Sequence, residues 1–241
     1  MKKIFYILTA VALLSSCMME DGFLDKVPLD KLSEDAVFNS PQVAEAHVNS
    51  FYTVLSDPFQ EGNVSAITDE GWFRYGGSST RYMYDGRLSP STILYISEGG
   101  QAHDSRTTTL NIWDRAYEFI YKMNYFLRAA ESEDSRLEKE TADRLKGEVY
   151  FLRAWAYYNL IQRYAGVPVI KVPHKIGGDE DFSVERANFD DCVDFILEDL
   201  DKAEALLPSK DATKRGRVNK DVAIALRARV TLLAASKLFN D

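Results

Sequence analysis

The most regular hydrophobic pattern in the chain lies between residues 189 and 207. Six apolar side chains recur there at steps of three and four, which is the spacing of one face of an α-helix: Phe189, Val193, Ile196, Leu200, Ala203 and Leu207. Asn188 is a suitable N-cap, and Asp190 and Asp191 follow in the first turn, where the helix dipole favours acidic groups. Because Pro208 cannot continue a helix, the pattern predicts an amphipathic helix over 189–207.

Two other stretches in the second half of the chain have the same spacing. One runs from about Glu138 to Tyr164 and ends before Gly166 and Pro168, with the apolar face Leu145, Val149, Leu152, Ala156 and Leu160. The other begins at the capping residue Asn219, with the apolar face Val222, Leu226, Val230 and Leu233. Both stretches are predicted to be helices.

Two earlier helices are predicted at 41–56 and at about 110–131. Ser40 is a candidate N-cap for the first, and Pro41 suits its first turn. The second carries Trp113, Tyr117, Ile120 and Leu127. Consecutive amphipathic helices predict an all-α fold of stacked helix pairs, and the absence of a 34-residue period predicts that any repeats are irregular.

The tract 57–109 separates the two earlier helices and contains seven glycines and two prolines without sustained periodicity. A loop of this length in a compact domain is usually functional or disordered, and its aromatic content argues against disorder. Its rings alternate with charged residues: Trp72, Phe73, Tyr75, Tyr82, Tyr84 and Tyr95 with Asp69, Glu70, Arg74, Arg81, Asp85 and Arg87.

This composition suits sugar binding, because flat rings stack on the apolar faces of pyranoses while charged groups hydrogen-bond the hydroxyls. The candidate ligand-binding residues are Trp72, Tyr75, Tyr82 and Tyr84. The same composition would serve a loop that packs its rings onto the helical scaffold. Both interpretations remain open for each ring.

The first residues have the order of a signal peptide. Lys2 and Lys3 precede an apolar run over 4–14, and the small residues Ser15 and Ser16 follow. The run is too short to span a bilayer, and the chain then becomes polar. Residues 1–16 are therefore predicted to be a targeting segment that is removed on export.

Leu14-Ser15-Ser16-Cys17 resembles a bacterial lipobox, in which the cysteine at the cleavage point receives a diacylglycerol and an N-terminal acyl chain. Several acyl chains anchor a protein durably, whereas one chain binds reversibly. The resemblance implies a lipid anchor at Cys17. The alternative is an ordinary secretory signal in which Cys17 stands by chance.

Composition narrows the possible partners of residues 17–241. After removal of 1–16, which contain two lysines and no acids, 27 basic residues face 37 acidic ones, a formal net charge of -10. This balance argues against a nucleic-acid partner. With Cys17 lipidated, Cys192 has no mate for a disulfide and is expected to pack as a small apolar residue.

Four stretches of the mature chain carry motifs in a recognisable order. The longest is LKGEVYFLRAWAYYNL at 145–160, followed by RYAGVP at 163–168. The others are FLD at 23–25 with Pro28, LEDLDKA at 197–203 with LLP at 206–208, and GRVNK at 216–220 leading into ALRARV at 225–230, AAS at 234–236 and LFN at 238–240. In order and spacing the four together resemble the SusD-like (RagB) lipoproteins.

The resemblance implies a binding protein on the outer face of a Gram-negative outer membrane, without enzymatic activity, cofactor or metal. Family members lie as lids over a TonB-dependent barrel (SusC-like), capture oligosaccharides and pass them to it. Their scaffold consists of tetratricopeptide-like helix pairs with irregular ligand-binding loops. An all-α fold of this kind, with a long aromatic-rich loop region, is therefore expected here.

The chain departs from the family pattern in two places. Ala165 stands where many members have glycine, which affects only the helix end. Family members continue for a comparable length beyond the position of Asp241, so 17–241 is expected to be the N-terminal helical domain of a SusD-like protein truncated at its C-terminal side. The missing half would supply further helices and part of the ligand site.

Sequence patterns for catalysis or metal binding are weak. The run 177–182 resembles a diguanylate cyclase signature with one inserted residue, but a polar turn between helices explains it better. Neighbours in sequence such as His103-Asp104-Ser105 rarely form a hydrolytic triad. The three histidines have no ligand spacing, and the acids Glu198, Asp199 and Asp201 are expected on the hydrated face of their helix.

Two classes of function stay open. The first is a glycan-capture subunit that works with a barrel. The second is a structural or adhesive surface protein that uses helical repeats to bind another protein. Exposed stacking aromatics favour the first, and an exposed apolar helix groove favours the second.

Overall fold

The computed structural model describes residues 40–55, 84–87, 112–132, 135–173 and 183–240. Over these residues the fold is helical, without strands, which confirms the all-α prediction. The elements are α3 (Pro41–Phe51), the 3₁₀ turn η2 (Tyr52–Val54), α5 (Trp113–Ala130), α6 (Lys139–Tyr164), α7 (Phe189–Leu206), the 3₁₀ turn η6 (Lys210–Ala212) and α8 (Lys220–Ala234).

Two of the three predicted caps form as expected. The side chain of Asn188 accepts a hydrogen bond from the backbone N–H of Asp191 at 2.7 Å, and Asn219 accepts one from Val222 at 3.2 Å. Ser40 occupies the N-cap position of α3, but its hydroxyl donates to Gln42 Oε1 at 3.1 Å and does not cap the helix. The predicted Ser40 side-chain cap is therefore wrong.

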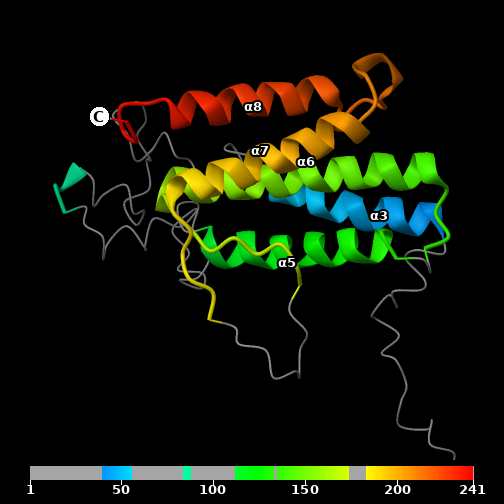
Figure 1. Cartoon of the computed structure of the whole chain (residues 1–241), viewed down its shortest axis with the longest axis horizontal. Coiled ribbons are helices and arrows are strands. Elements are labelled where there is room, and N and C mark those ends of the chain that lie inside the picture. Colours follow the sequence, from blue (N-terminus) through cyan, green and yellow to red (C-terminus); the bar gives the residue numbers. More distant parts are fainter. Residues whose placement is uncertain (1–39, 56–83, 88–111, 133–134, 174–182, 241) are drawn as a thin grey trace, which may run out of the picture.

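Helix α6 is the centre of the bundle (Figure 1). It packs against α3, α5 and α7, and α8 lies mainly on α7. The predicted apolar face of α6 is buried, but nearly every other side chain from Leu145 to Ile161 is buried as well. A helix that is surrounded on all sides needs this second set of buried residues, which the prediction of one apolar stripe did not include.

Close contact between α6 and α7 depends on Gly147. A Cβ at this position would lie 3.1 Å from Leu206 Cβ and from Leu207 Cγ. Cys192 on α7 is buried, as predicted, and its thiol donates to the carbonyl of Val167 at 3.5 Å. Helix α6, called the hallmark helix because it carries the 145–160 motif, and α7 are thus joined along most of their length.

The chain leaves α6 through an unusual backbone conformation. Ala165, the C-cap, has φ 55° and ψ -115°, a region that favours glycine. The next residue, Gly166, crosses the segment before α7 so closely that a Cβ would lie 2.2 Å from the carbonyl oxygen of Ala187. The glycine that many family members have at position 165 would suit this turn better than alanine.

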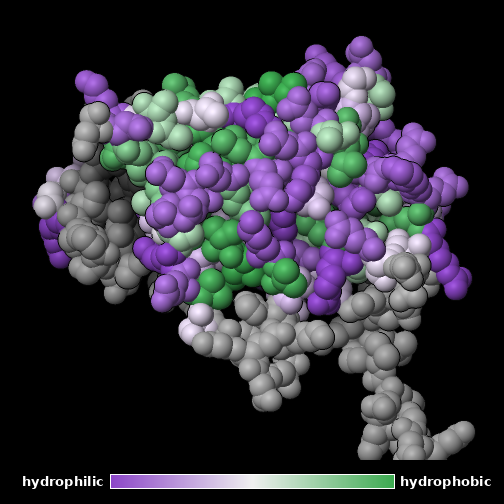
Figure 2. All heavy atoms as spheres, viewed as in Figure 1, coloured by the Kyte–Doolittle hydropathy of each residue, from purple (hydrophilic) through white to green (hydrophobic). Residues whose placement is uncertain are grey.

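Helix α8 buries one face and exposes another that is partly apolar. Ala223, Leu226 and Val230 pack inward, whereas Val222, which was predicted on the buried face, is exposed. Figure 2 shows apolar side chains along the edge where α8 lies, interleaved with polar ones. Among the described helices, none is both long enough and apolar enough to cross a membrane.

Candidate functional site

The residues predicted to bind sugar lie mostly outside the described part of the chain. Trp72, Tyr75 and Tyr82 fall there, as does the predicted anchor Cys17. Tyr84 is described and is 41% exposed. The motifs at 177–182 and 103–105 also fall outside.

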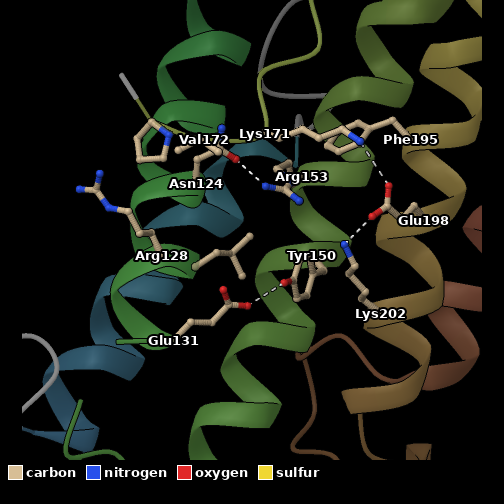
Figure 3. Close-up of a pocket in the computed structure, with 12 residues that line it drawn as sticks. Asn124, Arg128, Glu131, Tyr150, Arg153, Lys171, Val172, Phe195, Glu198 and Lys202 are labelled. Atoms are coloured by element: carbon tan, nitrogen blue, oxygen red, sulfur yellow. Dashed lines mark hydrogen bonds and ion pairs between the residues drawn. The ribbon is translucent and has the colours of Figure 1, made fainter. Parts of the chain in front are cut away.

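An open pocket of about 230 Å³ lies between α5, α6, α7 and residues 171–173 (Figure 3). We call it the α5–α6–α7 pocket. Charged, polar, aromatic and aliphatic side chains line it: Asn124, Leu127, Arg128, Glu131, Tyr150, Arg153, Lys171, Val172, Pro173, Phe195, Glu198 and Lys202. The lining comes from segments far apart in sequence, so no local motif could predict it.

Arg153 joins the three helices behind this pocket. Its Nε and Nη2 donate to the two carboxylate oxygens of Asp199 at 2.7 and 2.6 Å, and its Nη1 donates to Asn124 Oδ1 at 2.6 Å. Burial alone would lower the pKa of Arg153, but the bidentate Asp199 carboxylate raises it above the usual value. The guanidinium therefore stays charged although it is buried.

Asp199 corrects the prediction from sequence. It was expected on the hydrated face with Glu198 and Asp201, but it is fully buried. Its distance of three residues from Ile196 and four from Ala203 places it on the buried face, and this spacing could have identified it. The buried Arg153 within the apolar face of α6 is the second signal that sequence reasoning missed.

The segment 167–170, which leads into the lining residues 171–173, is fixed because side chains of α5 and α6 hold its backbone. The Tyr117 hydroxyl donates to the carbonyl of Pro168 at 2.7 Å, and Asn124 Nδ2 donates to that of Ile170 at 2.7 Å. The N–H of Ile170 donates to the Tyr157 hydroxyl at 2.8 Å. Burial raises the pKa of Tyr157, so its hydroxyl keeps its proton at neutral pH.

Two lysines share one carboxylate at the mouth of the pocket. Lys202 Nζ lies 2.7 Å from Glu198 Oε1, and Lys171 Nζ lies 3.5 Å from Glu198 Oε2. The hydrogen bond from Lys202 lowers the pKa of Glu198. All three side chains are exposed, so these ion pairs contribute little to stability and can rearrange.

Two rings, Phe195 and Tyr150, belong to the apolar part of the wall, together with Leu127, Val172 and Pro173. Phe195 has Arg153 and Lys171 over its ring, with the cationic atoms 5.1 and 5.2 Å from the ring centroid. Tyr150 has Lys202 Nζ at 5.4 Å, and its hydroxyl donates to Glu131 Oε1 at 3.3 Å. Burial raises the pKa of Tyr150 to about 12. Figure 3 shows these groups facing one another across the opening.

The other buried charge, Glu148, links two of the motif stretches. It accepts hydrogen bonds from Tyr52 at 2.7 Å, Arg144 at 2.8 Å and Arg217 at 2.6 Å. Arg217 also binds Glu45 on α3. The charged residues of the hallmark helix, Glu148 and Arg153, thus connect helices within the scaffold.

No cluster of histidine, cysteine and carboxylate groups suited to a metal ion occurs among the described residues. His47, the described histidine, packs against the rings of Phe51 and Phe126, with centroids 4.9 and 6.2 Å away.

Helix pairs around a buried central helix, with an open pocket on one side, define a tetratricopeptide-like helical scaffold. A sequence profile of SusD-like proteins, described as starch-binding and associating with the outer membrane, matches residues 22–232. The chain therefore belongs to the SusD-like family, as its motifs predicted.

Known proteins with similar sequence and structure are also SusD-like. SusD-like protein P38 of Formosa agariphila is 24% identical over 200 residues, which cover 83% of this chain and 36% of that protein. SusD-like protein P25 of the same organism is 22% identical over a region that covers 95% of this chain and 43% of that protein. A crystal structure of a SusD-like protein from Bacteroides fragilis is 28% identical, with a TM-score of 0.60 over 86% of this chain and 37% of that one.

The chain spans about two fifths of the length of the curated relatives that it matches. The family is described as starch-binding and as associating with the outer membrane. The particular ligand, anchor and partner of this chain are matters for proposal.

Proposed function

We propose that this protein is lipid-anchored through Cys17 at the cell surface, captures oligosaccharides and passes them to a TonB-dependent outer-membrane barrel. The observation that carries the proposal is the family match over residues 22–232, which begins directly after the lipobox. The net negative charge and the paired helices are compatible with a lid on a protein partner and not with nucleic-acid binding.

The proposed ligand-binding rings are Trp72, Tyr75, Tyr82 and Tyr84. Tyr84 supports this choice, since a large part of its surface is accessible to solvent. Aromatic rings at an exposed position offer a stacking surface to the apolar faces of pyranoses.

The test is calorimetry of the full-length protein with a panel of glycans, comparing wild type with Trp72→Ala, Tyr75→Ala, Tyr82→Ala and Tyr84→Ala. Replacing a ring that stacks on the sugar should weaken glycan binding, by about tenfold for each 1.4 kcal/mol of binding free energy lost. The melting temperature should hardly change. A ring that packs on the scaffold should instead lower the melting temperature and leave affinity intact. If all four variants bind glycans normally, the tract is scaffold and this site is rejected.

The barrel partner requires a separate experiment. Full-length protein extracted from membranes in mild detergent should co-purify with a large outer-membrane barrel. Repeated recovery of the protein alone would count against the transfer step while leaving glycan capture intact.

The alternative function, a structural or adhesive surface protein, is favoured by one observation. The outer face of α8 and the residues after it expose large apolar side chains: Val222, Ile224, Leu232 and Leu238. Exposed apolar side chains that form a contiguous patch are typical of protein contacts. Binding to host or neighbouring-cell proteins without measurable glycan affinity would support this alternative.

A further inference from the structure

A pair of tyrosines on α5 extends the surface of the α5–α6–α7 pocket. The rings of Tyr121 and Tyr125 stack with centroids 6.5 Å apart and an interplanar angle of 30°. Tyr121 is 38% exposed, and both rings lie on the side of α5 away from the buried residues Ile120 and Leu127. Their stacking therefore leaves ring surface at the outside of the bundle.

Arg128 connects this pair to the pocket. Its guanidinium carbon lies 5.2 Å from the centroid of the Tyr125 ring, and the same side chain lines the pocket. Figure 3 shows Glu131 on α5 pointing across the opening toward Tyr150 on α6, whereas the guanidinium of Arg128 points away from α6 and α7. The tyrosine pair therefore adjoins the pocket through Arg128.

The charges of this surface favour an anion. Four cationic side chains line the pocket, Arg128, Arg153, Lys171 and Lys202, against the carboxylates of Glu131 and Glu198. The guanidinium of Arg153 is hydrogen-bonded to Asp199 and Asn124, so its charge is already paired. Lys171 and Lys202, in contrast, share the single carboxylate of Glu198. A positive charge is left over at the mouth of the pocket, on a chain whose formal net charge is -8.

The lysines can reach an incoming ligand because they are held loosely. Their side chains are 60% and 43% exposed, and a pair at this exposure is weak enough for a ligand carboxylate to compete with Glu198. Fixed groups stand behind them, since Tyr150 and Phe195 belong to packed helices. The arrangement combines rigid rings with adjustable cations.

We propose that the α5–α6–α7 pocket and the Tyr121–Tyr125 pair form a binding subsite for a sugar unit that carries a carboxylate. The rings of Tyr121 and Tyr125 would stack on the sugar, and Lys171 and Lys202 would pair with its carboxylate. A pocket of about 230 Å³ is smaller than sites for drug-sized ligands and admits a single small unit. A protein partner would need a broader surface, of about 800 Å². This inference rests on the proposed glycan-capture function.

The test is affinity electrophoresis of the full-length protein in gels containing uronate polysaccharides (polygalacturonate, alginate, hyaluronate) or neutral ones (amylose, laminarin, xylan). We expect stronger retardation of the wild type by at least one uronate polysaccharide than by the neutral ones. The double variant Lys171→Gln/Lys202→Gln should lose about fivefold or more of that affinity and keep its binding to neutral glycans. Tyr125→Ala should weaken uronate binding to a similar degree.

Lys210→Gln is the matched control, because this exposed lysine lies in η6, outside the pocket. It should bind as the wild type does, and melting temperatures should show that all variants fold. Two results would overturn this inference and leave the proposed function standing. One is binding of neutral glycans without a preference for uronates, and the other is normal uronate binding by the double lysine variant. Absence of binding to every glycan would reject the proposed function itself. Lysine variants that lose only the barrel in co-purification would assign this surface to a protein contact and overturn the subsite.

Discussion

Arg153 illustrates how a charge can be tolerated inside the bundle. The cost of burying a guanidinium is met only when its donors are satisfied, and here Asp199 and Asn124 accept from three of its nitrogens. Asn124 in turn donates to Ile170. One charged side chain therefore sets the positions of α5, α7 and the 167–170 segment relative to α6.

Removal of the Asp199 carboxylate should lower the stability of the fold. We expect Asp199→Ala to lower the free energy of unfolding by about 3 to 5 kcal/mol, because Arg153 would remain buried without a counter-charge. Urea unfolding followed by circular dichroism measures this. Asp194→Ala, on the exposed side of the same helix, is the control and should change the value by less than about 0.5 kcal/mol. A loss below 1 kcal/mol for Asp199→Ala would show that the pair is not structurally important.

His47 provides a prediction for pH. Burial between aromatic rings, together with the nearby Lys122, lowers its pKa in the folded state. The unfolded chain then binds a proton more readily than the folded one, so stability falls as pH drops from about 6.5 towards the lower, folded pKa. The decrease is at most about 1.4 kcal/mol per pH unit.

The measurement is urea unfolding at pH 7.5, 6.5 and 5.5 for wild type and His47→Gln. The variant should lose less stability over this range than the wild type. Parallel curves for the two proteins would contradict a lowered pKa of the half-buried His47.

At the end of α6, two adjacent residues differ in how well they suit their positions. Ala165 has a conformation that suits glycine, and Gly166 lies where any side chain would meet the backbone at Ala187. Ala165→Gly should raise the free energy of unfolding by about 1 kcal/mol by relieving strain, and Gly166→Ala should lower it by about 1 to 3 kcal/mol. Both are measured by urea unfolding.

Ala228→Gly is the control for the first change. It lies on the exposed side of α8 within the helix and should lower stability by about 1 kcal/mol, since glycine disfavours a helix interior. If Ala165→Gly destabilises to the same extent, the turn is not strained.

The helices could be predicted from sequence because each has its own periodic apolar face and end signals. The pattern at 189–207 and the caps at Asn188 and Asn219 are local, and they are found as expected. Asp199 was misplaced because its charged neighbours suggested a hydrated face. The α5–α6–α7 pocket could not be predicted, since its walls meet only when helices distant in sequence pack together.

At the scale of the whole molecule, the helical scaffold follows a predicted targeting segment and a predicted lipid anchor. If Cys17 carries the lipid, Cys17→Ala should abolish labelling with a palmitate analogue and move the protein out of the membrane fraction, because two or more acyl chains are needed for durable anchoring. Ser16→Ala, which keeps a small residue before the cysteine, is the control and should remain labelled. Labelling retained in the Cys17 variant would reject the lipobox.

The burial of α6 on all sides also determines how the bundle opens. Its backbone amides between Leu145 and Ile161 can meet solvent only when α3, α5 and α7 separate from it, whereas α8 rests mainly on one neighbour. Hydrogen exchange in α6 should therefore require global unfolding, and exchange in α8 should occur through local opening at lower free energy. The slowest amides of the hallmark helix would then report the stability of the entire scaffold.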